Sequence, residues 1–251
     1  SFKRNEKENV TKDPLAIFKK VKRTKRIINK DVPLYDDSCL KEYVNLPYIG
    51  WVREGIMPDT CRRFNIGYSY DKRRIIIPWR KWDGDENEYL GIVGRTTVPK
   101  YELLDIPKYF GIIPFSKGIN IYGLNENYKY IQEAGYIVVF EAEKSTLKRA
   151  SRLDNTGSSL GNCEITDEQV RILISLDVEI VIALDEGIDI NHIRKECEKF
   201  YPLRKVSYIY DRWDLIPKGS KNSPADMPNK IYNFFDGARI TLKKQMDKYA
   251  D

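Results

Sequence analysis

The chain has 251 residues, of which 41% are hydrophobic and 12% aromatic, so it is not a disordered tail and can form one large domain or two small ones. Its 43 basic and 37 acidic residues give a net charge of +6, a moderate excess whose distribution matters more than its sum. The four cysteines form no CxxC pair and His192 is the only histidine, which excludes a structural zinc site of the usual ligand spacing and any evident disulfide framework. The sequence shows no secretory signal and no apolar run long enough to span a bilayer. We therefore expect a cytoplasmic protein without a membrane partner.

Residues 1–43 are predicted to form a basic arm or linker. Asp13 and Pro14 are typical of a helix start, and the apolar positions between 15 and 21 fit one amphipathic helix. The run at 19–26 is strongly basic. Such a run is equally typical of a solvated helix face and of an arm that contacts nucleic acid.

Residues 44–133 are predicted to form a small basic α/β subdomain. A short helical unit comes first, in which Asp59 is expected to cap a helix that runs through Phe64. Strands at 74–78 and 89–95 are expected to pair across a turn at 83–85. The following residues up to 133 are rich in Pro, Gly, Tyr and Lys, and we expect loops there that pack over the small sheet.

Strands and helices alternate from residue 134 to residue 235, which predicts an open, mainly parallel α/β sheet with right-handed crossovers. Residues 236–251 are predicted to form a helical tail. The strands are expected at 135–140, 178–184 and 206–211, and the helices at 143–152, from about Thr166, at 190–200, and from about Pro228.

Two buried strands end abruptly on carboxylates. Glu141 ends the first and Asp185 the next, Asp189 follows closely, and Asp226 lies in a turn-rich loop beyond the last strand. Because the carboxyl ends of parallel strands meet at one edge of a sheet, these carboxylates are expected to come together. Mg²⁺ prefers oxygen ligands and binds between carboxylates and phosphates. A metal-holding acidic centre in a basic chain indicates chemistry on nucleic acid, whereas the alternative is that each carboxylate merely caps the helix that follows it.

Three cations stand beside Gly, Pro or Tyr in the region of the small sheet: Arg95, Lys108 and Lys117. Scattered lysines and arginines usually lie in solvent without a specific partner. In loops that face an acidic metal site, however, they would bind a triphosphate and the template backbone.

Several short motifs follow one another in a specific order and spacing, at 51–56, 74–78, 91–95, 107–109, 115–118, 121–124 and 140–145. Together, from about 44 to 235, they make the chain resemble the catalytic core of DnaG-type DNA primases. The compact versions found in phages and mobile elements are the most similar. The resemblance implies a TOPRIM domain at 134–235.

This resemblance implies a nucleotidyltransferase of DNA replication. It would be a DNA-dependent RNA polymerase that makes short RNA primers on single-stranded DNA from ribonucleoside triphosphates, with Mg²⁺ or Mn²⁺ and with a replicative helicase as a candidate partner. It implies catalytic and metal-binding roles for Glu141 and Asp185. Arg95, Lys108 and Lys117 would be the catalytic cations, and with Arg53 they would bind nucleic acid or nucleotide.

The chain also departs from that pattern. Gly187 stands where the second aspartate of a DxD motif is expected, so that Glu186, Asp189 or Asp226 would have to complete the metal site. Asn222 stands where the third acidic motif leads us to expect a ligand. Two alternatives therefore stay open, a catalytically degenerate TOPRIM module that binds nucleic acid or nucleotide, and a TOPRIM nuclease. Gly187 favours the first, and the basic residues favour a primase over the second.

Overall fold

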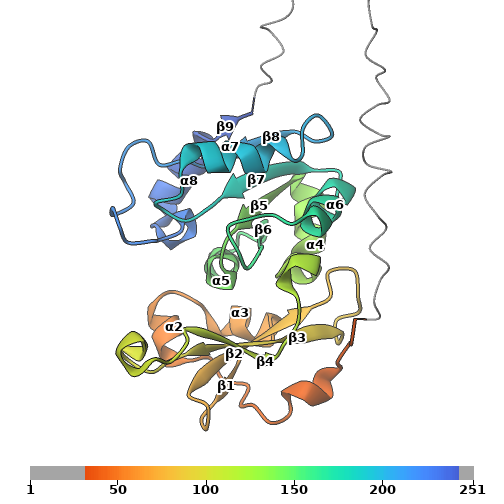
Figure 1. The fold of residues 1–251 in the computed structure, drawn as a ribbon, viewed down its shortest axis with the longest axis vertical. Coiled ribbons are helices and arrows are strands. Elements are labelled where there is room, and N and C mark those ends of the chain that lie inside the picture. Colours follow the sequence, from red (N-terminus) through yellow and green to blue (C-terminus); the bar gives the residue numbers. More distant parts are fainter. Residues whose placement is uncertain (1–31, 243–251) are drawn as a thin grey trace, which may run out of the picture. The chain divides into compact units, whose positions relative to one another are not determined.

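The computed structural model describes residues 32–242, which contain a small antiparallel sheet and a larger, mainly parallel one (Figure 1). The predicted helix at 15–21 and the basic run at 19–26 lie outside the described residues, as do residues 243–251. None of the helices in the described part is long and apolar enough to cross a membrane.

The small sheet has the strand order β1-β2-β3-β4, and every neighbouring pair is antiparallel. Its central hairpin confirms the predicted strand pair. β2 runs over Arg74–Arg80 and β3 over Tyr89–Thr96, with Ile76 opposite Gly94. β1 (Gly67–Ser69) and β4 (Tyr109–Ile113) flank this hairpin. β2 is buried along almost its whole length, as its unbroken run of isoleucines predicts.

Short helices precede this sheet: η1 (Asp37–Leu40), α2 (Ile49–Arg53) and α3 (Pro58–Arg63). The prediction that Asp59 caps α3 is wrong. Pro58 is the first helical residue, because its fixed φ suits that position and its missing N–H needs no partner there. Met57 therefore takes the cap position, without a side-chain hydrogen bond, and Asp59 lies in the first turn.

The prediction of loops throughout 96–133 is also wrong. The segment contains β4, the helix α4 (Leu124–Ala134), and two short 3₁₀ helices, η2 (Tyr101–Leu104) and η3 (Lys117–Ile119). α4 is bounded by Gly123 and Gly135 with positive φ, and it buries only Leu124, Asn127 and Ile131. Because these buried positions include an asparagine and the rest of the helix is polar, the apolar periodicity is weak.

The larger sheet has the order β6-β5-β7-β8-β9. The first four strands are parallel and β9 pairs with β8 in the antiparallel sense, so the predicted mainly parallel α/β sheet is confirmed. β9 occupies two residues of the predicted helical tail, and β6 was not predicted. The strands are β5 (Tyr136–Phe140), β6 (Gly157–Ser159), β7 (Glu179–Ala183), β8 (Val206–Tyr208) and β9 (Ile240–Thr241).

The predicted helices of this region are present, and a short 3₁₀ helix precedes the last of them. Thr166 caps α6 through a capping box with Gln169. The helices are α5 (Glu143–Ser151), α6 (Asp167–Ser175), α7 (Ile190–Glu198), η4 (Pro224–Asp226) and α8 (Asn229–Gly237).

α5 packs between the two sheets, against α3 on one side and against β5 and β6 on the other (Figure 1). Its Leu147 and Ala150 belong to the same buried cluster as Trp51 and Trp79 of the small-sheet region. The main chains of Tyr122 and Ser159 also form an isolated β-bridge. Loops of the small sheet are thereby brought against the carboxyl edge of the parallel sheet. A domain division near residue 133 stays a prediction.

Candidate active site at the carboxyl edge of the parallel sheet

Glu141 and Asp185 follow two neighbouring strands at the same edge of the sheet. β5 and β7 are parallel with Phe140 opposite Ala183, so both carboxylates lie just beyond the strand ends, as the sequence predicts. Burial and the negative charges of Glu141 and Asp226 raise the pKa of Asp185 to about 7. Burial also raises the pKa of Glu141. The edge is therefore crowded with carboxylates that repel one another.

Asp185 has the arrangement expected of a cation ligand. Its Oδ1 is buried and has no hydrogen-bond partner among the described residues. An unpaired carboxylate oxygen in a negative surrounding fits a divalent cation. Within residues 32–242, no group of three or more His, Cys, Asp or Glu side chains is placed to hold a metal ion by itself. Mg²⁺ is commonly held by one or two carboxylates with water and substrate phosphates, so Glu141 and Asp185 fit such an ion.

The other two predicted metal ligands already have partners in the protein. Asp189 is exposed and caps α7, because its Oδ1 accepts a hydrogen bond from the Asn191 N–H at 2.8 Å. Asp226 accepts from Lys148 through Oδ1 and from the Ser223 N–H through Oδ2. Their roles as metal ligands stay predictions, whereas Asp185 has a buried oxygen without a partner.

An acid-lined pocket of about 460 Å³ opens beside Asp185, and Glu186, Asp189 and Asp211 also line it. Gly187 lies in its wall with φ +90°, a backbone conformation that residues with a Cβ rarely adopt. Glycine in place of the expected aspartate thus suits the backbone conformation of this turn.

Tyr109, at the start of β4, links the predicted cations to the acidic edge. Its hydroxyl accepts a hydrogen bond from Arg95 Nη1 at 3.4 Å, and the Lys117 Nζ lies 5.6 Å from the centre of its ring. Burial raises the pKa of Tyr109, and so do the charges of Glu143 and Asp185. The tyrosine therefore lies within electrostatic reach of both groups of charges. Sequence reasoning missed it, although it stands in one of the motifs.

The charge of Lys108 lowers the pKa of both strand-end carboxylates. The lysine is exposed, and its effect on Glu141 and on Asp185 opposes that of burial. The predicted association of Lys108 with the acidic edge thus has a counterpart in the structure. Arg53 is exposed on the last turn of α2, two residues after Trp51, whose ring Arg95 covers.

Lys117 is held in place by a buried carboxylate. Its Nζ lies 2.7 Å from Oε1 of Glu143, and the Trp79 Nε1 donates to the same oxygen at 3.2 Å. Gly161 has φ +77°, and a Cβ there would lie only 2.6 Å from the Lys117 Cδ. Sequence reasoning missed Glu143, two residues after Glu141 in the same motif.

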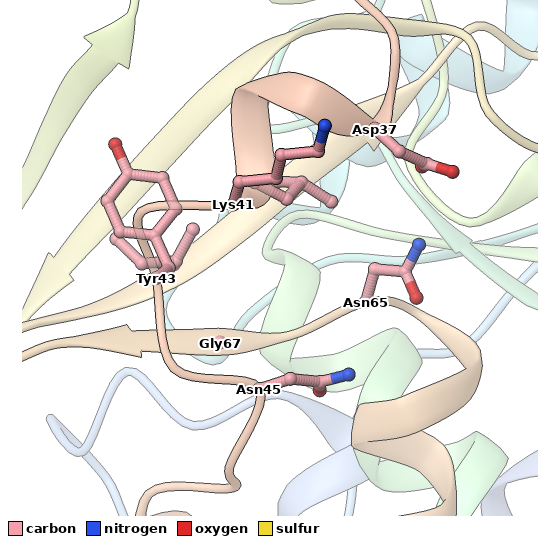
Figure 2. A pocket seen from close by; sticks show the side chains of 8 residues that line it. Asp37, Lys41, Tyr43, Asn45, Asn65 and Gly67 are labelled. Carbon is pink, nitrogen blue, oxygen red and sulfur yellow. The ribbon is translucent and has the colours of Figure 1, made fainter.

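Two other pockets contain none of the predicted site residues. One, of about 380 Å³, lies beside η1 and the start of β1. Figure 2 shows Asp37 and Asn65 close together at one side of it and Tyr43 across from them. The second, of about 680 Å³, is lined by Arg80 and Glu126, which pair with each other at 2.8 Å. We therefore place the candidate site at the carboxyl edge.

No protein-family model matches the chain. A curated relative is the SPbeta prophage-derived uncharacterized protein YorJ of Bacillus subtilis (strain 168). It is 28% identical over 243 residues, an alignment that covers 83% of this chain and 60% of that protein. The chain thus spans about three-fifths of the length of the curated relative that it matches.

Among solved structures, the zinc-binding and RNA polymerase domains of the Aquifex aeolicus primase match with a TM-score of 0.67 at 20% identity, over 85% of this chain and 62% of that one. A DnaG primase catalytic domain bound to single-stranded DNA matches with a TM-score of 0.62 at 15% identity, over 82% of this chain and 77% of that one. The E. coli primase catalytic core gives 0.59 at 16% identity, over 82% and 79%. The chain therefore has the fold of the DnaG primase catalytic core, as the sequence motifs predict.

Proposed function

We propose that this protein is a DNA primase that synthesises short RNA primers on single-stranded DNA from ribonucleoside triphosphates. The observation that carries the proposal is the position of Glu141 and Asp185 at one carboxyl edge of the parallel sheet, with the charge of Lys108 acting on both, in a chain with the fold of the DnaG catalytic core. A DnaG catalytic domain of this fold was solved bound to single-stranded DNA, which supports a template of that kind. The protein would act in the cytoplasm, with a replicative helicase as its candidate partner.

In this proposal Glu141 and Asp185 hold a divalent ion, Mg²⁺ or Mn²⁺. Such an ion neutralises charge on the phosphates and makes a hydroxyl easier to deprotonate. Lys108, Lys117 and Arg95 bind phosphate oxygens of the incoming nucleotide and the template, because cations at phosphates form strong charge-assisted hydrogen bonds. Tyr109 keeps Arg95 and Lys117 together. Arg53 would extend the phosphate-binding surface along α2.

The test is template-directed incorporation of ribonucleotides on single-stranded DNA, with the full chain in Mg²⁺ or in Mn²⁺. We expect short RNA products, more abundant in Mn²⁺ because Mg²⁺ demands near-ideal octahedral geometry and gives up its waters reluctantly, whereas Mn²⁺ is the less demanding ion. Asp185→Asn should lower the rate at least a hundredfold. The proposal fails if this variant polymerises as fast as the parent.

A second candidate function is a non-catalytic module that binds nucleic acid or nucleotide. Gly187 favours it, and so does the pairing of Asp226 with Lys148, because together they leave few free carboxylates. The same assay separates the two functions. A chain that binds single-stranded DNA but makes no RNA in either metal is the module, and one that shortens the template is a nuclease.

A further inference from the structure

A row of three cations runs along α5 and its C-cap, and two of them contact the loop that carries Asp226. Lys144, Lys148 and Arg152 are spaced four residues apart, which places them along one side of the helix and its C-cap. Lys144 pairs with Glu54, whereas Lys148 pairs with Asp226. Arg152 Nη1 donates to the carbonyls of Ala225 and Met227 at 3.1 and 2.6 Å, on either side of Asp226. α5 thereby clamps η4 in place.

The carboxylate of Asp226 is fully engaged within this clamp. Lys148 Nζ lies 2.5 Å from Oδ1, with the two side chains only 9% and 21% exposed. The Ser223 N–H donates to Oδ2 at 2.9 Å, and the Ser223 hydroxyl in turn accepts from the Ala225 N–H. Asp226 thus forms an ion pair with a partly buried ammonium and has a partner at each oxygen, whereas Asp185 Oδ1 has none.

This ion pair lies beside the acidic edge, because Pro224 of η4 lines the same pocket as Asp185 and the Glu186 N–H donates to the Asn222 carbonyl at 2.9 Å. The negative charge of Asp226 reaches Asp185, where it adds to that of Glu141. Of the four carboxylates predicted as metal ligands, Asp189 caps α7 and Asp226 is paired with Lys148. The two that remain suit one divalent ion, since a second would meet the fixed charge of the ammonium without a free ligand.

We propose that Lys148 takes the electrostatic place of a second metal ion, so that this chain binds a single divalent ion through Glu141 and Asp185 while Asp226 serves only to hold the lysine. The inference rests on the proposed function for its chemical setting. The number of bound ions can be measured without primer synthesis.

The first experiment titrates Mn²⁺ into the EDTA-treated and dialysed full chain by calorimetry. The parent should bind one ion per chain. The variant Lys148→Met/Asp226→Asn replaces a neutral ion pair by a neutral pair, so it should also bind one ion, with a dissociation constant within about threefold of that of the parent. Zero or two ions in the parent, or binding weakened tenfold or more in the double variant, would overturn the inference, because the last result makes Asp226 a metal ligand.

The second experiment frees Asp226 by Lys148→Met alone, which should tighten Mn²⁺ binding about tenfold because one repelling charge is gone. Lys148→Met/Gly187→Asp should bind two ions. Lys144→Met, one turn away on the same helix, is the matched control and should behave as the parent. The inference fails if the Lys148 and Lys144 variants bind Mn²⁺ alike. Circular dichroism checks the fold, and the neutral double variant keeps the test decisive if Lys148→Met does not fold.

The two proposals fail in different ways. Primer synthesis by a chain that binds two ions would refute only the role of Lys148. A single bound ion without primer synthesis would refute only the primase.

Discussion

At the scale of single residues, the site consists of partly buried charged groups, and the charge on each one affects the stability of its neighbours. Asp185 is an acid in an unfavourable place, with its pKa raised by burial and by two neighbouring carboxylates. Lys117 and Glu143 are the opposite case, since each neutralises the other. Removing the charge of Asp185 should therefore stabilise the fold, whereas removing the charge of Lys117 should destabilise it.

The stability of the metal-free protein should depend on pH through Asp185. Its pKa is about 7 when folded, against an ordinary value of 3.8. The free energy of unfolding that the neutral Asp185 side chain contributes is therefore fully present below pH 4, and it is lost as the pH rises through 7. In EDTA, Asp185→Asn should melt roughly 3–8 °C above the parent at pH 8 and at nearly the same temperature at pH 4, by thermal denaturation. An equal difference at both pH values would contradict this cause, and excess Mn²⁺ should stabilise the parent more than the variant.

Lys117→Ala should destabilise the fold by about 3 kcal/mol, because it leaves the buried Glu143 carboxylate without its cation. Denaturant unfolding measures the loss. Lys117→Ala/Glu143→Gln should recover most of it, and Lys108→Ala, at an exposed lysine, is the control that should change little. If the double variant is no more stable than the single one, the unpaired charge is not the cause.

At the scale of elements, the loop after β7 decides how many carboxylates the edge presents. Its turn places Gly187 at φ +90°, and no atom lies within 4 Å of the point that a Cβ would occupy there. Space is therefore available, but the backbone conformation is strained for any other residue. A substitution there has a conformational cost that must be separated from the effect of a new carboxylate.

Gly187→Asp and Gly187→Ala should both lose about 1 kcal/mol of unfolding free energy, because both place a Cβ at a positive φ. Only Gly187→Asp should raise RNA synthesis in Mg²⁺, since only it adds a ligand oxygen to the edge. Rates in Mg²⁺ and Mn²⁺ for the two variants provide the measurement. An equal change in both variants would assign the effect to the backbone.

At the scale of the whole molecule, the small sheet supplies cations and the parallel sheet supplies carboxylates, and α5 holds the two against each other. In the proposed function, a nucleic acid bound at this junction would contact the cations of one part through its phosphates while its reactive end lies at the acidic edge of the other. Its affinity must then depend strongly on salt.

Binding of single-stranded DNA should weaken with salt by roughly 0.7 log units per log unit of salt for each phosphate contact. Lys108→Ala should lower that slope by about one contact. Lys195→Ala, at an exposed lysine on α7, should leave it unchanged. Fluorescence anisotropy at several salt concentrations measures the slopes, and a slope near zero in the parent would remove the case for phosphate binding.

The sequence by itself determined the elements whose pattern is local. The apolar runs of β2, β5 and β7 predict buried strands, and their alternation with helices predicts a parallel sheet. From that order it follows that Glu141 and Asp185 lie at one edge, because parallel strands share a direction. The helix α4 was missed since its buried face contains Asn127, and tertiary packing overrode a weak periodic signal.

Only the tertiary structure decided which charges meet. Lys117 and Glu143 are 26 positions apart, and Lys148 and Asp226 are 78 apart. No local pattern links such residues, because their contact depends on how α5 packs against the small sheet and against η4. The same packing leaves Asp185 Oδ1 without a partner and brings Lys148 to Asp226, whereas Asp189 finds its partner locally, at the start of α7. Residue types at strand ends thus predicted where the carboxylates gather, whereas long-range packing decided that Asp226 is paired with Lys148 and that Asp185 keeps an unpaired oxygen.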